Sequence, residues 1–281
     1  MKNFYTNVQT SGINILYRGI VNGKRVKQRI EYSPSLYIPS KIPSKFKSLD
    51  GDNLQQKMFG NIREARDYVK QFENISGAPK VYGNTRYEYA FIADQHAGMI
   101  EWEFDKILIA FIDIEVGSEN GFPDPYKADE PITAITVTYL NGSTHVFGCG
   151  EYETKGQEHY YRCKDEWTLC RQFLKLMNDR CPDVITGWNT KFFDIPYIVN
   201  RFNKILGETE TKKLSPWGFI TTRRNVYNGR EMTSYDLEGI ASLDYIELYK
   251  WYAEGGKSQE SYRLDNIANV ELGERKLSYE E

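Results

Sequence analysis

The chain has 281 residues, 40% of them hydrophobic and 27% charged, which is long enough for two domains with separate cores and ordinary for a globular protein. Its formal net charge of −3 neither indicates nor excludes a nucleic-acid partner. The sequence has no apolar run of about eighteen residues and no apolar signal core near its start, so we expect a cytoplasmic protein with no membrane partner.

Positive charge is concentrated in the first part of the chain. Residues 1–103 contain 15 Lys and Arg and 10 Asp and Glu, a net charge of +5, whereas residues 104–281 contain 21 and 29, a net charge of −8. Residues 18–47 alone hold eight basic residues and one acid. This pattern fits a phosphate-facing surface beside a metal site, and it also fits a solvated basic hairpin.

The first 103 residues predict a small α+β domain. Asn22 and Gly23 separate two stretches of alternating apolar and polar residues, which indicates a β-hairpin. Residues 61–77 have helical periodicity and end at Gly77. Residues 81–98 return to the alternation that is typical of a strand.

Residues 104–281 predict an α/β domain, with a mixed sheet and helices packed on it. The apolar segment 106–116 predicts a central strand, and Asn141-Gly142 predicts the turn of a hairpin over residues 131–148. The remaining periodic segments predict a strand at 183–189 and helices at 165–180, 193–207 and 243–255.

Two acids end the predicted central strand. Asp113 and Glu115 share one face of that strand, and their Cα atoms are expected roughly 6.5 Å apart. Two neighbouring carboxylates repel unless a cation lies between them, and oxygen ligands of this kind suit Mg²⁺ or Mn²⁺. The simpler alternative is an exposed strand end with two solvated acids.

A third acid follows the next strand. In the segment TGWNTKFFDIPYI, residues 186–198, a short strand ends at Gly187 and Asp194 opens a helix. An aspartate at this position is commonly a helix N-cap, and that interpretation stays open beside a role in a metal site.

These segments resemble a known family. FIDIEV and GWNTKFFDIPYI resemble the first two exonuclease motifs of family B DNA polymerases. Further segments resemble the replicative polymerases of T-even-like bacteriophages in order and spacing: FPDP, NRFNKILG, LSPWG, SLDYIELYKWY and SYRLDNIA. The resemblance implies a ribonuclease-H-like DEDD-type 3′–5′ exonuclease domain over residues 104–281, incomplete at its C-terminal end, after a family B N-terminal domain over residues 1–103.

The resemblance also implies the chemistry. Such a domain removes nucleotides from the 3′ end of DNA and so proofreads, with two Mg²⁺ or Mn²⁺ ions. It implies that Asp113 and Glu115 hold the metal that activates water, that Asp113 also contacts a second metal at the leaving 3′ oxygen, and that Asp194 supports this second ion.

The resemblance further implies contacts with DNA. Phe122 is expected to wedge against the terminal bases, Phe193 to stack on the 3′ nucleotide, and Asn189 to bond the DNA backbone. Asn228 and Gly229 are expected at the tip of a hairpin that helps to separate primer from template. The alternative for the first three residues is ordinary loop packing.

One expected motif is missing. The DEDD chemistry needs a fourth acid in a Tyr-x-x-x-Asp motif, and none follows Asp194. Tyr161 and Asp165 have this spacing but precede the second motif, and Asp165 is typical of a helix cap. The chain therefore resembles the front part of a polymerase, as a fragment or as one half of a split polymerase.

This interpretation sets the expected partners. They are DNA primer–template, single-stranded 3′ ends, and a C-terminal polymerase part from the same gene or a separate chain, in the cytoplasm of an infected bacterial host. A second hypothesis is a non-catalytic module that binds single-stranded nucleic acid through its basic and aromatic residues. A third is an unrelated ribonuclease-H-like nuclease whose late acid is Asp244 or Asp265.

Overall fold

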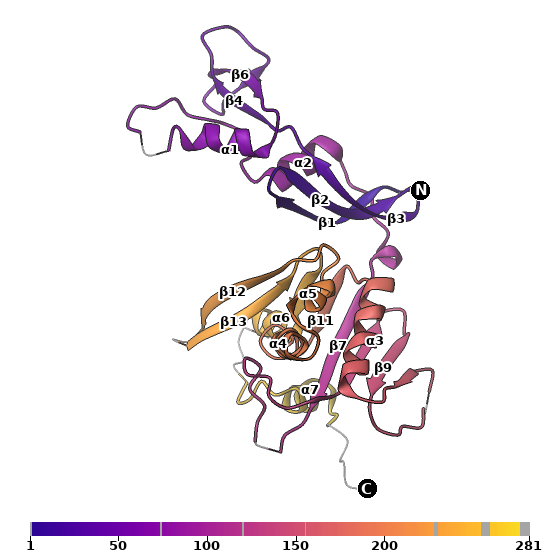
Figure 1. The fold of residues 1–281 in the computed structure, drawn as a ribbon. Helices are drawn as coiled ribbons and strands as arrows, with labels where there is room; N and C mark the ends of the chain where they lie inside the picture. The colour runs from indigo at the N-terminus through magenta and orange to yellow at the C-terminus, as the bar shows by residue number, and fades with distance from the viewer. Residues whose placement is uncertain are drawn as a thin grey trace. The chain divides into compact units, whose positions relative to one another are not determined.

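The computed structural model describes residues 2–73, 75–119, 121–154, 156–227, 230–253 and 259–275. Contacts between Cα atoms divide the chain into two compact units, residues 1–106 and residues 107–281 (Figure 1). Each unit has its own hydrophobic core.

The first unit contains two small antiparallel sheets, with strand orders β1-β2-β3 and β4-β6-β5. Asn22 and Gly23 have φ angles of 51° and 75° at the turn between β2 and β3, which confirms the predicted hairpin. The elements are β1 (Phe4–Ser11), β2 (Asn14–Val21), β3 (Lys24–Glu31), β4 (Ser35–Pro39), β5 (Phe46–Lys47), β6 (Asn53–Met58), α1 (Ile62–Lys70), α2 (Tyr87–Gln95) and the 3₁₀ turn η1 (Phe104–Lys106).

Helix α2 lies where the alternating sequence predicted a strand, so that prediction was wrong. Tyr87 and Phe91 are 1% and 4% exposed, whereas Tyr89 between them is 50% exposed. A strand would place all three side chains on one face, and only the helical period buries the outer two without the middle one. The ring of Phe91 contacts the rings of Tyr17 and Tyr32 in the core of this unit.

Helix α1 is shorter than the segment 61–77 predicted. Its start is fixed by a reciprocal cap, because the Asn61 side chain accepts from the Glu64 amide at 3.0 Å and Glu64 accepts from the Gly60 amide at 2.9 Å. The helix ends at Lys70, and residues 71–73 form a turn.

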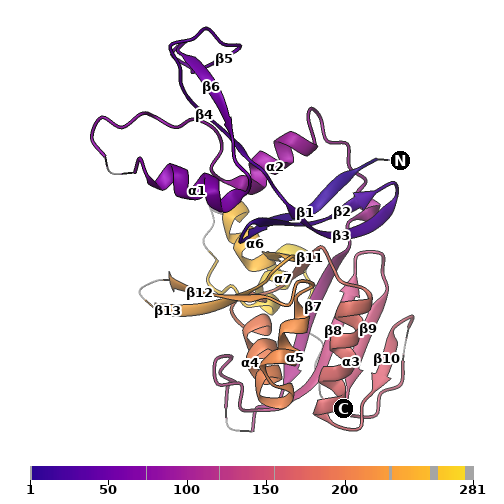
Figure 2. The same cartoon turned by 45° about the horizontal axis from the view of Figure 1, so that its top comes forward.

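The second unit is built on a six-stranded mixed sheet with the order β10-β9-β8-β7-β11-β14 (Figure 2). Neighbours among β7, β8 and β9 are antiparallel, and the other pairs are parallel. This confirms the predicted α/β class and the central place of β7. The strands are β7 (Ile109–Val116), β8 (Ile132–Tyr139), β9 (Thr144–Gly148), β10 (His159–Arg162), β11 (Val184–Gly187) and β14 (Ala241–Asp244).

Helices α3 (Glu166–Asp179) and α4 (Asp194–Leu206) pack on one face of this sheet (Figures 1 and 2). Asp165 caps α3 as predicted, since its carboxylate accepts from the Thr168 amide at 2.8 Å. Gly207, with φ 84°, ends α4. The short helix α5 (Glu208–Thr211) and the 3₁₀ turn η2 (Lys212–Leu214) follow.

The strands β12 (Ile220–Tyr227) and β13 (Arg230–Leu237) form an antiparallel hairpin. The predicted turn residues Asn228 and Gly229 lie outside the described residues. The Tyr235 hydroxyl donates to the Asn200 side chain at 2.9 Å and connects this hairpin to α4.

The last elements are helices α6 (Tyr245–Ala253) and α7 (Leu264–Leu272). The helix predicted for residues 243–255 begins later, because Leu243 and Asp244 belong to β14 and pair with Thr186 and Gly187 of β11. Within the described ranges, every helix is too short or too polar to cross a bilayer.

Candidate active site

Strand β7 separates acids from apolar side chains. Ile112 and Ile114 are 2% and 6% exposed and face the core under α3 and α4. Asp113 and Glu115 alternate with them and lie on the exposed face of the same strand. The strand therefore presents two carboxylates side by side, as its sequence period predicted.

Asp194 meets β7 from the start of α4. Its carboxylate oxygen accepts a hydrogen bond from the Ile114 amide at 3.2 Å, across 80 positions of sequence, and the residue is 3% exposed. The N-cap position of α4 is occupied by Phe193, which makes no capping hydrogen bond through its side chain. The structure therefore does not support the simple interpretation of Asp194 as a helix cap.

The charge of Asp194 is unfavourable at this place. Burial, followed by the neighbouring charge of Asp113, raises the pKa of Asp194 to about 7, although the hydrogen bond from the Ile114 amide acts in the opposite direction. A carboxyl group with this pKa is about half protonated at neutral pH. The carboxylates of Asp113 and Asp194 repel each other, and a cation bound between them would relieve this repulsion.

The donor chemistry of these acids fits a hard divalent cation, since all the side chains offer carboxylate oxygens and Asp194 is destabilised in its charged form. Lys191, a nearby cation in sequence, bonds Glu247 at 2.7 Å. In the described part of the chain, no group of three or more His, Cys, Asp or Glu side chains is arranged to hold a metal ion. The acids are therefore suitable in type, and they do not form a closed metal cage.

Two of the residues predicted to contact DNA touch each other at the start of α4. The ring of Phe122, which is 88% exposed, lies 5.6 Å from the ring of Phe193. Phe193 also contacts the ring of Tyr197, at 5.9 Å. The exposed ring of Phe122 therefore packs beside the half-buried ring of Phe193, next to the residue that opens α4.

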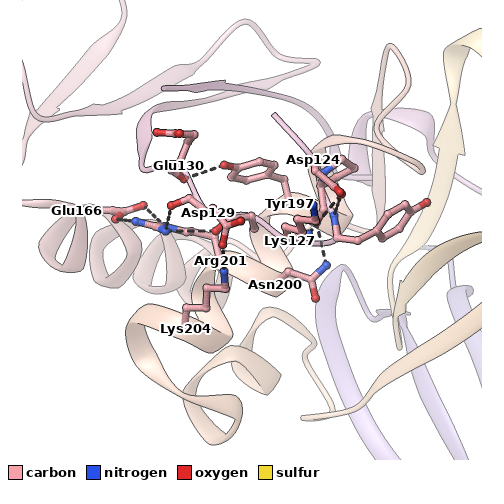
Figure 3. Close-up of polar contacts among 12 residues, drawn as sticks. Asp124, Lys127, Asp129, Glu130, Glu166, Tyr197, Asn200, Arg201 and Lys204 are labelled. Carbon is pink, nitrogen blue, oxygen red and sulfur yellow. Dashed lines mark hydrogen bonds and ion pairs between the residues drawn. The ribbon is translucent and has the colours of Figure 1, made fainter. Parts of the chain in front are cut away.

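The loop between β7 and β8, residues 121–131, is held by side chains of α4 (Figure 3). The Tyr197 hydroxyl donates to the Glu130 carbonyl at 2.7 Å, and the Asn200 side chain donates to the Pro125 carbonyl at 2.9 Å. These bonds fix the backbone of the loop that carries the exposed phenylalanine.

Arg201 completes this attachment (Figure 3). Its guanidinium makes two hydrogen bonds to Glu166 of α3, at 2.8 and 2.7 Å, and donates to the carbonyls of Ala128 and Asp129 at 3.2 and 2.7 Å. Glu166 also accepts from the Ile132 amide at 2.7 Å. This pair was not predicted from the sequence, although an arginine inside the apolar run of α4 was an available signal.

The loop between β11 and α4 packs closely on β7. A side chain at Gly187 would place its Cβ 2.6 Å from the Ile112 carbonyl oxygen and would also meet the Thr190 side chain. Asn189 has φ 67°, which is uncommon for a residue other than glycine. Asp244 of β14 accepts a hydrogen bond from the backbone amide of Asn189 in this loop. Asp265, the other candidate for a metal-binding acid late in the chain, is exposed on α7.

A groove of about 630 Å³ lies beside this loop. Asn189 and Phe192 line it from the loop, Met232 from β13 and Trp251 from α6. Trp251 is 79% exposed. The groove gives the loop an open, partly aromatic flank.

The family model for DNA polymerase family B, exonuclease domain, matches residues 80–267. The chain belongs to this family. Family B exonuclease domains are metal-dependent 3′–5′ exonucleases, which agrees with the type of ligand that Asp113, Glu115 and Asp194 provide.

The family B relatives are longer proteins. The chain is 33% identical to the DNA-directed DNA polymerase of Escherichia phage RB69 and 30% identical to that of Enterobacteria phage T4, over its whole length and 34% of theirs. It is 26% identical to the DNA polymerase catalytic subunit of Equine herpesvirus 2 (strain 86/87), over 66% of the chain and 19% of that protein. The chain thus spans about a third of the phage relatives' length.

We expect Arg201→Met to destabilise this exonuclease domain by about 3 kcal/mol, because it leaves the poorly exposed Glu166 carboxylate without its cation. Urea unfolding followed by circular dichroism measures the change. The matched control is Lys204→Met on the same helix, whose partner Asp129 is largely exposed, and which should cost less than about 1 kcal/mol. Equal effects of the two substitutions would contradict a special role for Arg201.

We expect Asp194→Asn to stabilise the metal-free protein at pH 8 by up to about 4 kcal/mol, because the folded-state pKa is raised to about 7 from 3.8. A raised carboxyl pKa penalises folding above the unfolded-state pKa, and the penalty grows until pH exceeds the folded-state pKa. The advantage of the variant should therefore shrink from pH 8 to pH 5 and vanish near pH 4. Thermal unfolding in EDTA at several pH values tests this, and a pH-independent difference would contradict it.

Proposed function

We propose that this chain is the N-terminal and 3′–5′ exonuclease part of a phage replicative DNA-directed DNA polymerase. In this proposal residues 1–103 are the N-terminal domain and residues 104–281 are the exonuclease domain, incomplete at its C-terminal end. The contact between the Asp194 carboxylate and the Ile114 amide carries the proposal. It places a third acid, distant in sequence, against the strand that holds the other two.

Asp113, Glu115 and Asp194 are the proposed catalytic and metal-binding residues, for two Mg²⁺ or Mn²⁺ ions. Ions bound there would supply an ionised water and would neutralise charge at the leaving 3′ oxygen. Asp113 and Glu115 contribute oxygens from a rigid strand, so their spacing is fixed by the sheet. Asp194 contributes a buried carboxylate whose orientation is set by the Ile114 amide.

Phe122 and Phe193 are proposed to stack on the terminal bases of the DNA, which gives affinity without sequence preference, as proofreading requires. Asn189 is proposed to bond the DNA backbone from its place in the groove. Asn228 and Gly229 are proposed to act at the tip of the β12–β13 hairpin, where primer and template separate.

The proposed partners are DNA primer–template, single-stranded 3′ ends and a C-terminal polymerase part, from the same gene or another chain, that supplies the fourth acid. The proposed location is the cytoplasm of the infected bacterial host. The length of the phage relatives supports a C-terminal part. The alternative of a non-catalytic nucleic-acid-binding module has less support, because the matched family is an exonuclease domain.

Degradation of a 5′-labelled single-stranded oligonucleotide tests the proposal. Because this chain lacks the fourth acid, we expect slow Mn²⁺- or Mg²⁺-dependent shortening from the 3′ end, no shortening in EDTA or with a blocked 3′ end, and a further loss of about 100-fold or more in Asp113→Ala. The loss follows because this substitution removes one of the two carboxylates of β7 that would hold the ions.

Glu208→Gln is the control for this assay, since Glu208 is an exposed acid of α5 paired with Lys212 and should leave the rate unchanged. Undiminished shortening by Asp113→Ala would contradict the assignment of the site. Shortening of the 3′-blocked substrate would contradict the direction of the reaction.

We expect Phe122→Ala to weaken binding of single-stranded DNA by about 1–3 kcal/mol, because one base loses its stacking partner. Its 88% exposure means that the fold should be unaffected. Fluorescence anisotropy with a labelled oligonucleotide in Ca²⁺ measures the affinity. Leu140→Ala, an exposed apolar residue after β8 beside the opposite end of β7, is the control, and an equal loss there would contradict a stacking role for Phe122.

A further inference from the structure

Asp244 lies at the end of β14, directly beside the end of β11. Its parallel partner in the sheet is Gly187, the residue from which the chain enters the loop before α4. Asp244 is only 4% exposed. A charged side chain buried at this point needs several hydrogen-bond donors.

Three backbone amides provide those donors. One carboxylate oxygen accepts from Asn189 at 3.0 Å and from Ile246 at 3.1 Å, and the other accepts from Lys191 at 3.0 Å. The bond from Ile246 is local and fixes the start of α6. The other two reach across to the loop, on either side of Thr190, which is fully buried.

These two bonds act where the loop changes direction. Asn189 adopts φ 67°, and its carbonyl then accepts from the amides of Phe192 and Phe193 at 3.2 and 3.0 Å. The Thr190 carbonyl accepts from Ile195 at 2.9 Å, inside the first turn of α4. The turn therefore passes directly into the helix turn that carries Asp194.

We propose that Asp244 is a positioning residue, whose carboxylate holds the Asn189 turn and thereby sets Asp194 against the Ile114 amide of β7. The importance of this role for catalysis rests on the proposed function. Asp244 itself is not assigned as a ligand, because its oxygens are already used by three amides of its own chain. It acts through Asp194.

Asp244→Asn in the full chain tests the role. The amide group keeps one acceptor but turns an N–H toward a backbone N–H, so at least one bond to the loop is lost. We expect amide hydrogen exchange of Ile114, followed by NMR, to become about tenfold faster or more, because Asp194 no longer stays in place. We also expect weaker Mn²⁺ binding by calorimetry.

Asp183→Asn is the matched control. Asp183 is 1% exposed at the opposite end of β11, and it accepts from the Leu108 amide at 2.8 Å. This substitution should destabilise the sheet there and leave Mn²⁺ affinity and the relative exchange rate of Ile114 unchanged. Equal acceleration of Ile114 in both variants would overturn the proposal, because it would report general loosening.

A wild-type measurement keeps the proposal testable if Asp244→Asn does not fold. The amides of Asn189, Lys191 and Ile114 should then exchange with the same dependence on low urea, as one opening event. Independent opening of Ile114 overturns the role of Asp244, whether or not the chain degrades DNA. Coupled opening in a chain that neither binds Mn²⁺ nor shortens DNA overturns the proposed function alone.

Discussion

The hydrogen bond at the Ile114 amide is the constraint on which the site depends. Pairing between β7 and β11 ends at Phe111 and Thr186. The Ile114 amide of β7 lies beyond this pairing, so it needs a hydrogen-bond partner from outside the sheet. Asp194 provides this partner from the first turn of α4. The bond that satisfies the strand thus also places a third carboxylate beside the two acids of β7.

Contacts of the two neighbouring loops keep the Asp194 carboxylate in this position. On one side, the close approach of Gly187 to the Ile112 carbonyl leaves no room for the loop to shift toward the strand. On the other, Asp244 binds the loop amides, while the pair of Arg201 and Glu166 fixes the neighbouring β7–β8 loop. These buried and hydrogen-bonded charges hold the two loops beside the acids of β7.

Features set by the local spacing of side chains could be predicted from the sequence. Features set by contacts between residues far apart in the sequence could not. The common face of Asp113 and Glu115 follows from the strand period alone. Helix α2 was not predicted because its aromatic residues alternate along the sequence as they would in a strand. The contacts of Phe91 with Tyr17 and Tyr32, which favour the helix, have no local signal. The reach of Asp194 to a residue 80 positions away has no local signal, and a resemblance to a family was needed to suspect it.

The raised pKa of Asp194 couples cation binding to pH and to the fourth acid. Near pH 7 this carboxyl is about half protonated, so a cation that binds there must displace a proton, and its apparent affinity falls as pH is lowered. In the proposed function a fourth acid adds negative charge, which strengthens cation binding but raises the pKa of Asp194 further whenever the ion is absent. The fourth acid and the ions therefore stabilise each other, and the C-terminal part that carries this acid is expected to dock more tightly when metal is bound.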